Sequence, residues 1–431
     1  MTTIDDDLPA RFYWLPPMLR PTEPMLRREE RVFLLVGLAA LFAGFDQNVY
    51  GFAIPQIQAS LHIPENQIGV TVTYFRLATF VAMVLALTAD IVGRRRLLLI
   101  TIFGQAAFTL ATAFSETYVQ FVWLQVLTRV FGYAEEMLCF VVIVEEVAAN
   151  VRGWAAGTLA GLTYTGAGLA ALCFAAVNIL PGHWRALYVI GGFSMFFLAF
   201  LRRRLPETKR FQVRHEEVGK LNARVGGAFD MVRRMAHEYP ARILLIILVS
   251  GGGGFAVGPS TVLAASYLQK TLHYAPWQAS ALMIPGGLFA LWLNILMGRL
   301  SDRIGRKRAI ALMMSLCGIA YAVFFSGIQG VIIPVLWIAA FFGFFTATSL
   351  TRSLSAEIVP TAYRATIGGI CYCAEIMLGG VSLGLEGVWY DYFHAHGPAI
   401  SVSLLAIPIA LVALFFLPEP AGRVLEDISH A

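Results

Sequence analysis

The sequence predicts an all-α membrane protein with twelve transmembrane helices in two six-helix, pseudo-symmetric bundles. Two observations predict this fold class. The 431-residue chain is 58% hydrophobic and only 14% charged, which is too little charge for a soluble domain of this length. In addition, residues 298–307 resemble residues 86–95, which lie 212 positions earlier in the chain.

Apolar stretches of roughly 20 residues recur along the chain, each long enough to cross a hydrocarbon core about 30 Å thick. Because lipid offers backbone groups no water to bond with, these stretches must be helical. The first half is expected to contain spans at 32–54, 67–89, 97–115, 119–144, 155–180 and 185–201. The second half is expected to contain spans at 242–268, 277–298, 308–328, 331–355, 366–390 and 398–417.

Basic residues concentrate in the connections on one side of these spans. Of the 32 Lys and Arg residues, Arg76, Arg129 and Arg352 lie in the interior of spans. The others lie in connections or at span ends, and of these only Arg185 and Lys270 fall on the opposite side. The positive-inside rule therefore predicts that both termini lie in the cytoplasm, with the protein in the cell (inner) membrane. The net charge of +5 is a consequence of this topology and does not indicate a nucleic-acid partner.

The predicted organisation has five parts along the chain. They are a cytoplasmic segment 1–31, a bundle 32–201, a cytoplasmic linker 202–241, a second bundle 242–417 and a cytoplasmic tail 418–431. Within the linker, residues 223–237 place apolar residues at helical spacing opposite arginines, which predicts an amphipathic helix at the membrane surface. A solvated linker between the bundles is the alternative.

The 212-residue offset also links landmarks outside the loop segments. The aligned residues are Glu145 with Glu357, Arg152 with Arg364, and the pair Pro206-Glu207 with Pro418-Glu419. Four landmarks at one offset indicate two homologous halves. Two repeats in a membrane chain are typical of a secondary transporter, in which the solute site lies between the halves.

The paired loops, with the pattern Gly/Ala-x-x-x-Asp-x-x-Gly-Arg-Arg/Lys, resemble the signature of the major facilitator superfamily. The other aligned landmarks resemble its sugar-porter and organic-ion branch. The resemblance implies alternating access, with loop charges that hold one side shut and separate when the halves rock. A role in topology alone is the alternative for the arginines. The predicted gating residues are Asp90, Gly93, Arg94, Glu145, Arg152, Gly298, Asp302, Gly305, Arg306, Glu357 and Arg364.

Ionisable residues inside the spans are candidates for function, because a charge at the bilayer centre costs several kcal/mol. Asp46 lies midway along the first span and Arg129 near the middle of the fourth. The resemblance implies that Asp46 is a proton site and Arg129 its partner. The alternative is a permanent ion pair that only locks the two helices together.

Helical periodicity separates two neighbouring carboxylates on the fourth span. At 100° per residue, Glu136 lies within roughly 20° of the face of Arg129, whereas Glu135 points away. The predicted proton-coupling residues are therefore Asp46, Glu136 and, in the eleventh span, Glu375. All eight histidines fall in loops or at span ends, so the expected proton route uses carboxylates alone.

Arg76, in the second span, has two interpretations. Its planar guanidinium suits an anionic solute, and it could instead pair with Glu375 or Glu386. The predicted solute-binding residues are Arg129, Arg76, Gln47, Tyr50 and Tyr164.

The sequence thus predicts proton-coupled symport of a small organic, anionic metabolite by a monomer in the lipid bilayer. A sugar or polyol uniporter or symporter, and a proton-coupled organic-ion or drug exporter, are the alternatives. Sugar is disfavoured because the seventh span reads Ser-Gly-Gly-Gly-Gly-Phe where similar sugar porters carry paired glutamines. No catalytic motif, metal-ligand spacing or nucleotide-binding loop occurs, so neither an enzyme nor a cofactor is expected.

Overall fold

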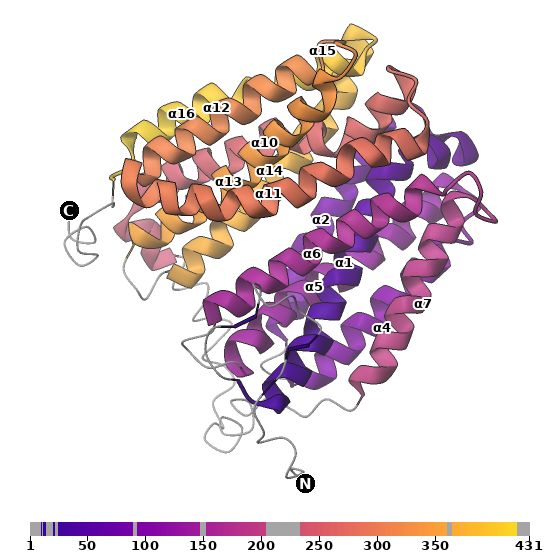
Figure 1. The fold of residues 1–431 in the computed structure, drawn as a ribbon, viewed down its shortest axis with the longest axis horizontal. Coiled ribbons are helices and arrows are strands. Elements are labelled where there is room, and N and C mark those ends of the chain that lie inside the picture. Colours follow the sequence, from indigo (N-terminus) through magenta and orange to yellow (C-terminus); the bar gives the residue numbers. More distant parts are fainter. Residues whose placement is uncertain are drawn as a thin grey trace. The chain divides into compact units, whose positions relative to one another are not determined.

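The computed structural model describes residues 10, 12–13, 20–21, 25–88, 93–146, 152–203, 233–359 and 364–419. Each predicted span coincides with a helix in this part of the chain (Figure 1). Eight of the helices found there are long and apolar enough to cross a membrane. The prediction of an all-α membrane fold is therefore confirmed.

The helices of the first half follow the predicted order. They are α1 Arg27–Leu61, α2 Gln67–Leu87, α4 Arg94–Thr112, α5 Tyr118–Glu146, α6 Arg152–Ala175 and α7 Trp184–Arg202. The predicted amphipathic helix at 223–237 lies outside the described residues, except for its last five positions, which are helical.

The second half contains α10 Pro240–Lys270, α11 Pro276–Ile304, α12 Arg306–Phe324, α13 Ile332–Glu357 and α14 Arg364–Phe393. Its last span is divided by a turn into α15 His396–Ser403 and α16 Ala406–Phe416.

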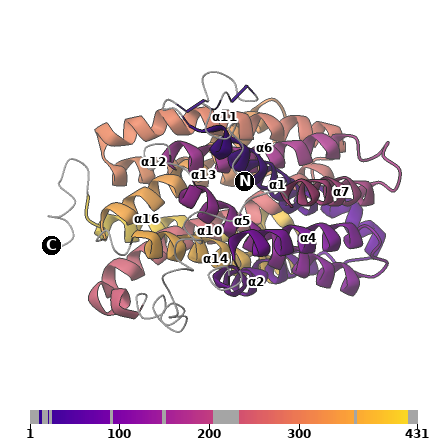
Figure 2. The same ribbon diagram turned by 90° about the horizontal axis from the view of Figure 1, so that it is seen from below.

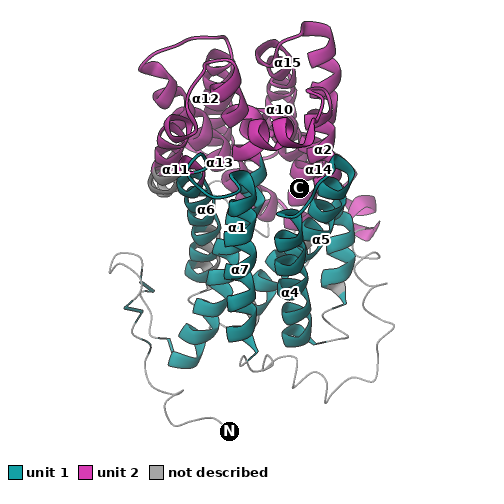
Figure 3. Ribbon diagram, turned by 90° about the vertical axis from the view of Figure 1, so that its right-hand side faces the viewer, with its two compact units in different colours: residues 1–50, 78–173, 177–221 teal, residues 51–77, 174–176, 222–431 magenta. Residues whose placement is uncertain are grey.

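The chain forms two compact units, which Figure 3 shows in separate colours. Unit 1 contains residues 1–50, 78–173 and 177–221, and unit 2 contains residues 51–77, 174–176 and 222–431. The end of α1 and the first half of α2 thus group with the helices of the second sequence half. The division into bundles at 32–201 and 242–417 stays a prediction.

Unit 1 is built around α4, which packs against both α5 and α7 (Figure 2). Its core is filled by apolar side chains such as Phe33, Leu97, Leu138 and Leu198. On the other face of α7, Phe193, Phe197 and Phe200 are exposed at helical spacing. An apolar core beneath an apolar exposed surface is the arrangement expected of a helix that faces lipid.

Glycines in α10 allow its backbone to contact α14 in unit 2. A Cβ atom on Gly254 would lie 2.1 Å from the carbonyl oxygen of Glu375, and one on Gly258 would lie 2.6 Å from that of Gly379. Helix α10 continues unbroken through these glycines and Pro259. The glycine run therefore serves close helix packing, as such runs commonly do in membranes, and does not interrupt the helix.

Candidate functional site

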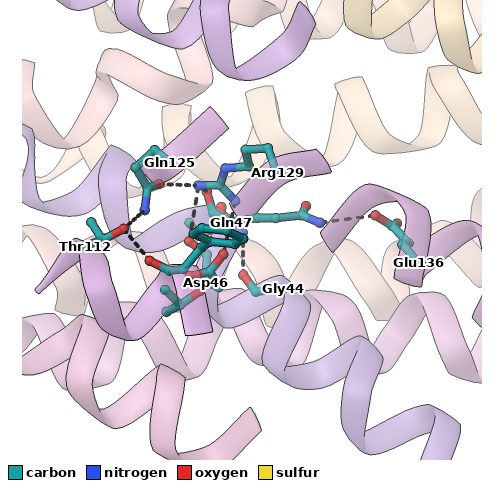
Figure 4. Close-up of polar contacts among 10 residues, drawn as sticks. Gly44, Asp46, Gln47, Thr112, Gln125, Arg129 and Glu136 are labelled. Atoms are coloured by element: carbon teal, nitrogen blue, oxygen red, sulfur yellow. Dashed lines mark hydrogen bonds and ion pairs between the residues drawn. The ribbon is translucent and has the colours of Figure 1, made fainter. Parts of the chain in front are cut away.

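A buried ion pair joins α1 to α5 in unit 1, as predicted (Figure 4). Arg129 Nη1 lies 3.6 Å from Asp46 Oδ2, and both side chains are at least 96% buried. Thr109 of α4 donates a hydrogen bond to Asp46 Oδ1 at 3.0 Å. Among the described residues, Asp46 Oδ2 has no hydrogen-bond partner. This carboxylate is thus neutralised by charge but only partly hydrogen-bonded.

The guanidinium of Arg129 is held in place by oxygens other than the carboxylate. Its Nη2 donates to the backbone carbonyls of Asp46 and Gln47 at 3.3 and 3.2 Å and to Gln125 Oε1 at 3.4 Å. Gln125 in turn donates to Thr112 Oγ1 at 3.2 Å. Arg129 can therefore keep its position when the charge of Asp46 changes.

The next residue along α1 connects this pair to a second carboxylate. Gln47 Nε2 donates a hydrogen bond to Glu136 Oε2 at 3.1 Å (Figure 4). Glu136 thus lies on the face of α5 that carries Arg129, as periodicity predicted. Tyr50 is buried with its ring 5.8 Å from that of Phe121, whereas Tyr164 is exposed.

Glu135 belongs to a different cluster, whose partner the sequence did not reveal. Its carboxylate forms a buried ion pair with Arg202 of α7 and accepts a hydrogen bond from Thr101 of α4. Arg202 also donates to the Leu35 carbonyl at 3.2 Å and contacts Cys139 Sγ at 3.5 Å. Arg202 was assigned to the cytoplasmic linker; it is instead the last residue of α7 and is fully buried.

In unit 2, Glu375 of α14 is paired with Arg352 of α13, with Nη2 and Oε2 2.9 Å apart. Both line a cavity of about 20 Å³, room for roughly one water molecule, together with Ser250 and Thr351. The Ser250 hydroxyl is buried without a hydrogen-bond partner among the described residues. A small, mainly apolar cavity with a few polar groups in its wall therefore adjoins the third predicted proton-coupling residue.

Arg76 lies against α14 at its glycines. Its Nη1 donates to the Ile376 carbonyl at 3.2 Å, and a Cβ on Gly379 would lie 2.2 Å from the same nitrogen. The carboxylates considered as its partners have other contacts, since Glu375 pairs with Arg352 and Glu386 bonds to His396.

The second loop signature forms a compact charged cluster. Arg306 Nε lies 3.3 Å from Glu357 Oε1. Glu419 accepts hydrogen bonds from the backbone N–H groups of Arg306 and Lys307, at 2.9 and 3.0 Å, and so caps the start of α12. Gly305 has φ +98°, a conformation that favours glycine.

The first loop signature repeats part of this geometry. Gly93 has φ +101°, close to that of Gly305, and Arg94 is buried at the start of α4. Gly298 lies within α11. The remaining predicted gating residues lie outside the described residues or side chains; they are Asp90, Glu145, Arg152, Asp302 and Arg364.

A family model of the Major Facilitator Superfamily matches residues 36–374 and, in a second match, residues 244–429. The chain belongs to the major facilitator superfamily. This major facilitator protein is a multi-pass secondary transporter of small organic solutes and not an enzyme.

Several relatives of the transporter match along most of their length. It is 26% identical over 406 residues to a Haemophilus influenzae protein named for metabolite transport, covering 91% of this chain and 97% of the relative. It is 24% identical to the gallate transporter of Pseudomonas putida, with 93% and 94% covered. It is 25% identical to the 4-hydroxybenzoate transporter of the same species, with 84% and 86% covered.

A solved structure also matches this major facilitator protein. The crystal structure of a D-xylose–proton symporter superposes with a TM-score of 0.71, covering 91% of this chain and 99% of that one. At 16% identity this likeness shows the fold alone.

Proposed function

We propose that the transporter imports a small organic anion together with protons, and that aromatic carboxylates are the first solutes to test. The observation that carries the proposal is the buried, incompletely hydrogen-bonded Asp46 carboxylate 3.6 Å from Arg129. Two relatives named for gallate and 4-hydroxybenzoate support the solute class, because both compounds are aromatic carboxylates.

The ion pair suggests why proton and anion would travel together. A proton on Asp46 removes the charge that neutralises Arg129, while the carbonyls of Asp46 and Gln47 keep the guanidinium in place. The carboxylate of a bound solute would then neutralise the uncompensated positive charge of Arg129. Proton and anion therefore favour each other's binding, and this coupling is reciprocal.

The remaining parts of the proposal follow the charge distribution of the sequence. Both termini lie in the cytoplasm, the protein resides in the inner membrane as a monomer, and the loop signatures gate the cytoplasmic side. The Arg306–Glu357 pair and the capping of α12 by Glu419 support the gating role, because they tie three separate segments together.

Asp46→Asn tests the coupling. In proteoliposomes with a pH gradient, we expect the variant to lose accumulation of 4-hydroxybenzoate while counterflow of the same compound survives, because asparagine keeps the size but cannot titrate. Glu116→Gln, an exposed carboxylate in the α4–α5 connection, is the matched control and should accumulate solute normally. If Asp46→Asn still accumulates solute with an unchanged pH dependence, the proton site lies elsewhere, and Glu136 and Glu375 become the candidates.

Arg129→Gln tests the solute's charge. We expect its affinity for 4-hydroxybenzoate to fall at least about tenfold, the loss of roughly 1.4 kcal/mol or more from a charged contact, while binding of the neutral methyl ester changes little. Arg76→Gln is measured beside it, since either arginine was predicted to bind the anion. Preference for a neutral or cationic solute would overturn the anion proposal and favour a sugar carrier or an organic-cation exporter.

A further inference from the structure

Charged side chains from both sequence halves meet at one end of unit 2. Lys270, the last residue of α10, forms an ion pair with Glu65 in the α1–α2 connection and also bonds to Gln58 of α1. Beside them, Gln56 donates to Gln269 at 2.8 Å. These contacts link positions more than 200 residues apart and fasten the first half of the sequence to the second.

His396 lies at the centre of the same cluster. Its Nδ1 is 2.8 Å from Glu386 Oε1 of α14, and its Nε2 is 3.3 Å from Glu65 Oε2. The ring of Tyr390 lies against the imidazole, with the centroids 4.4 Å apart. The His396 side chain is 8% exposed and that of Glu386 is fully buried. A histidine at a span end, which the sequence left without a function, is thus enclosed between two carboxylates.

With His396 between Glu386 and Glu65, the cluster binds one proton more than the same side chains would bind if they were apart. An ionised carboxylate only accepts hydrogen bonds, and a neutral imidazole donates through one nitrogen alone. Both ring nitrogens of His396 face carboxylate oxygens, so the cluster is satisfied when the imidazole is doubly protonated or Glu386 carries the proton. In the second case Glu386 Oε1 carries the proton and donates it to Nδ1, while Nε2–H donates to Glu65.

The charges in the cluster balance only with this extra proton. Lys270 and a protonated His396 supply two positive charges, and Glu65 and Glu386 supply two negative charges. Burial alone would raise the pKa of Glu65, but its contacts with His396 and Lys270 outweigh burial and lower that pKa to about 2. Glu65 therefore stays ionised at any pH that a cell meets, and the exchangeable proton belongs to the His396–Glu386 pair.

Other charged and titratable groups beside the cluster have partners of their own. Asp391 of α14 accepts a hydrogen bond from Asn66 at 3.3 Å, and Tyr390 stacks on His396. Among the described residues, neither Asp391 nor Tyr390 accepts a hydrogen bond from a ring nitrogen of His396.

We propose that His396 is the centre of a proton-binding latch: joining the two halves at this end takes one proton from the adjoining solution onto the His396–Glu386 pair, and separating them releases it. The latch is distinct from the Asp46–Arg129 pair and needs no solute. It rests on the proposed function only in that the halves separate at this end during transport. Acidic solution on this side, the outer side in the proposed topology, would favour the joined state.

The experiment measures opening of this end against pH in the full-length protein without solute. Spin labels are placed through unnatural amino acids at Ala59 and Thr271, two exposed positions next to Gln58 and Lys270. Above the ordinary histidine pKa of roughly 6.5, the ratio of separated to joined molecules should rise by up to about tenfold per pH unit, as expected when one proton is released. A ratio independent of pH would overturn the proposal.

Two histidine variants give the decisive contrast. His396→Gln keeps hydrogen-bonding capacity but cannot titrate, so its ratio should not change with pH. His394→Gln removes an exposed histidine two residues away and should behave like the wild type. Equal pH dependence in both variants would contradict the latch. If His396→Gln does not fold, as judged by its elution and melting temperature, Glu386→Gln is used instead and should likewise weaken the dependence.

Asp46→Asn separates this proposal from the proposed function. Its labels should report the same pH-dependent opening as the wild type, even though its proton-driven accumulation is lost. If the variant retains accumulation and opens normally, the role of Asp46 alone is contradicted. If it loses accumulation and shows no pH-dependent opening, the latch alone is contradicted.

Discussion

Two buried carboxylate–arginine pairs among the described residues of unit 1 share helix α5 and differ in how completely they are hydrogen-bonded. Glu135 has contacts at both oxygens, from Arg202, Cys139 and Thr101. Asp46 accepts one hydrogen bond, from Thr109, lies near the side chain of Gln105 and faces a guanidinium at 3.6 Å. Both pairs are nearly inaccessible to solvent, so burial alone does not distinguish them.

The difference indicates separate tasks for the two pairs. Removing one partner of a fully bonded, buried pair leaves a charge that nothing nearby can satisfy. A partly bonded carboxylate gives up less when it takes a proton, because fewer hydrogen bonds to its ionised form are lost. We therefore expect the Glu135–Arg202 pair to hold α5 and α7 together and the Asp46–Arg129 pair to titrate.

The largest loss of stability is expected when the Glu135–Arg202 pair is broken. Arg202→Met leaves the Glu135 carboxylate buried without its cation, and we expect a loss of about 3–5 kcal/mol in the free energy of unfolding. The measurement is reversible unfolding in mixed detergent micelles. The double variant Arg202→Met with Glu135→Leu should recover most of the loss. A cost below about 1 kcal/mol for the single variant would remove the distinction between the pairs.

Asp46→Asn is expected to have a smaller effect on stability. Arg129 keeps three oxygen acceptors when the carboxylate is removed, so we expect a loss of roughly 1–2 kcal/mol in the same unfolding assay. A loss equal to that of Arg202→Met would mean that both pairs are structural, and the alternative of a permanent lock between α1 and α5 would then hold.

The Lys270–Glu65 pair is partly exposed to solvent, and breaking it should have the smallest effect on the free energy of unfolding. Glu65→Gln is expected to cost at most about 1 kcal/mol near pH 7, because solvent screens this pair. The pKa of Glu65 is lowered from 4.5 to about 2, so its contribution is present above pH 4.5 and is lost as the pH falls toward 2.

Unfolding of wild type and Glu65→Gln is therefore compared at pH 7, 5 and 3. The stability difference between them should be the same at pH 7 and 5 and smaller at pH 3. Glu116→Gln serves as the control for an exposed carboxylate. A difference that grows in acid would have the wrong sign and would contradict the assigned ion pair.

The sequence was sufficient for the helices and for one of the two pairs. The twelve spans were predicted because a bilayer imposes a length and an apolar composition that can be read locally. The pairing of Asp46 with Arg129 came from resemblance to known symporters. The orientation of Glu135 and Glu136 followed from helical periodicity, which needs no tertiary information.

The partners that were missed depend on which helices are neighbours. The sequence places Arg202 at the start of a basic cytoplasmic linker, because a residue at a span end gives no local sign of burial. For the same reason, the sequence indicates no function for His396, which also lies at a span end. The sequence does not show what the glycines of α10 contact, and only the position of the α14 backbone shows that they permit close packing.

That contact has a mechanical consequence. Because the α10 and α14 backbones are in contact at Gly254 and Gly258, we expect the two helices to move together as a rigid pair. This helix pair also carries Lys270 and Glu386, the second-half residues of the proposed latch. A force applied at either residue would reach the cavity beside Glu375 with little loss, because the same rigid pair of helices carries all three.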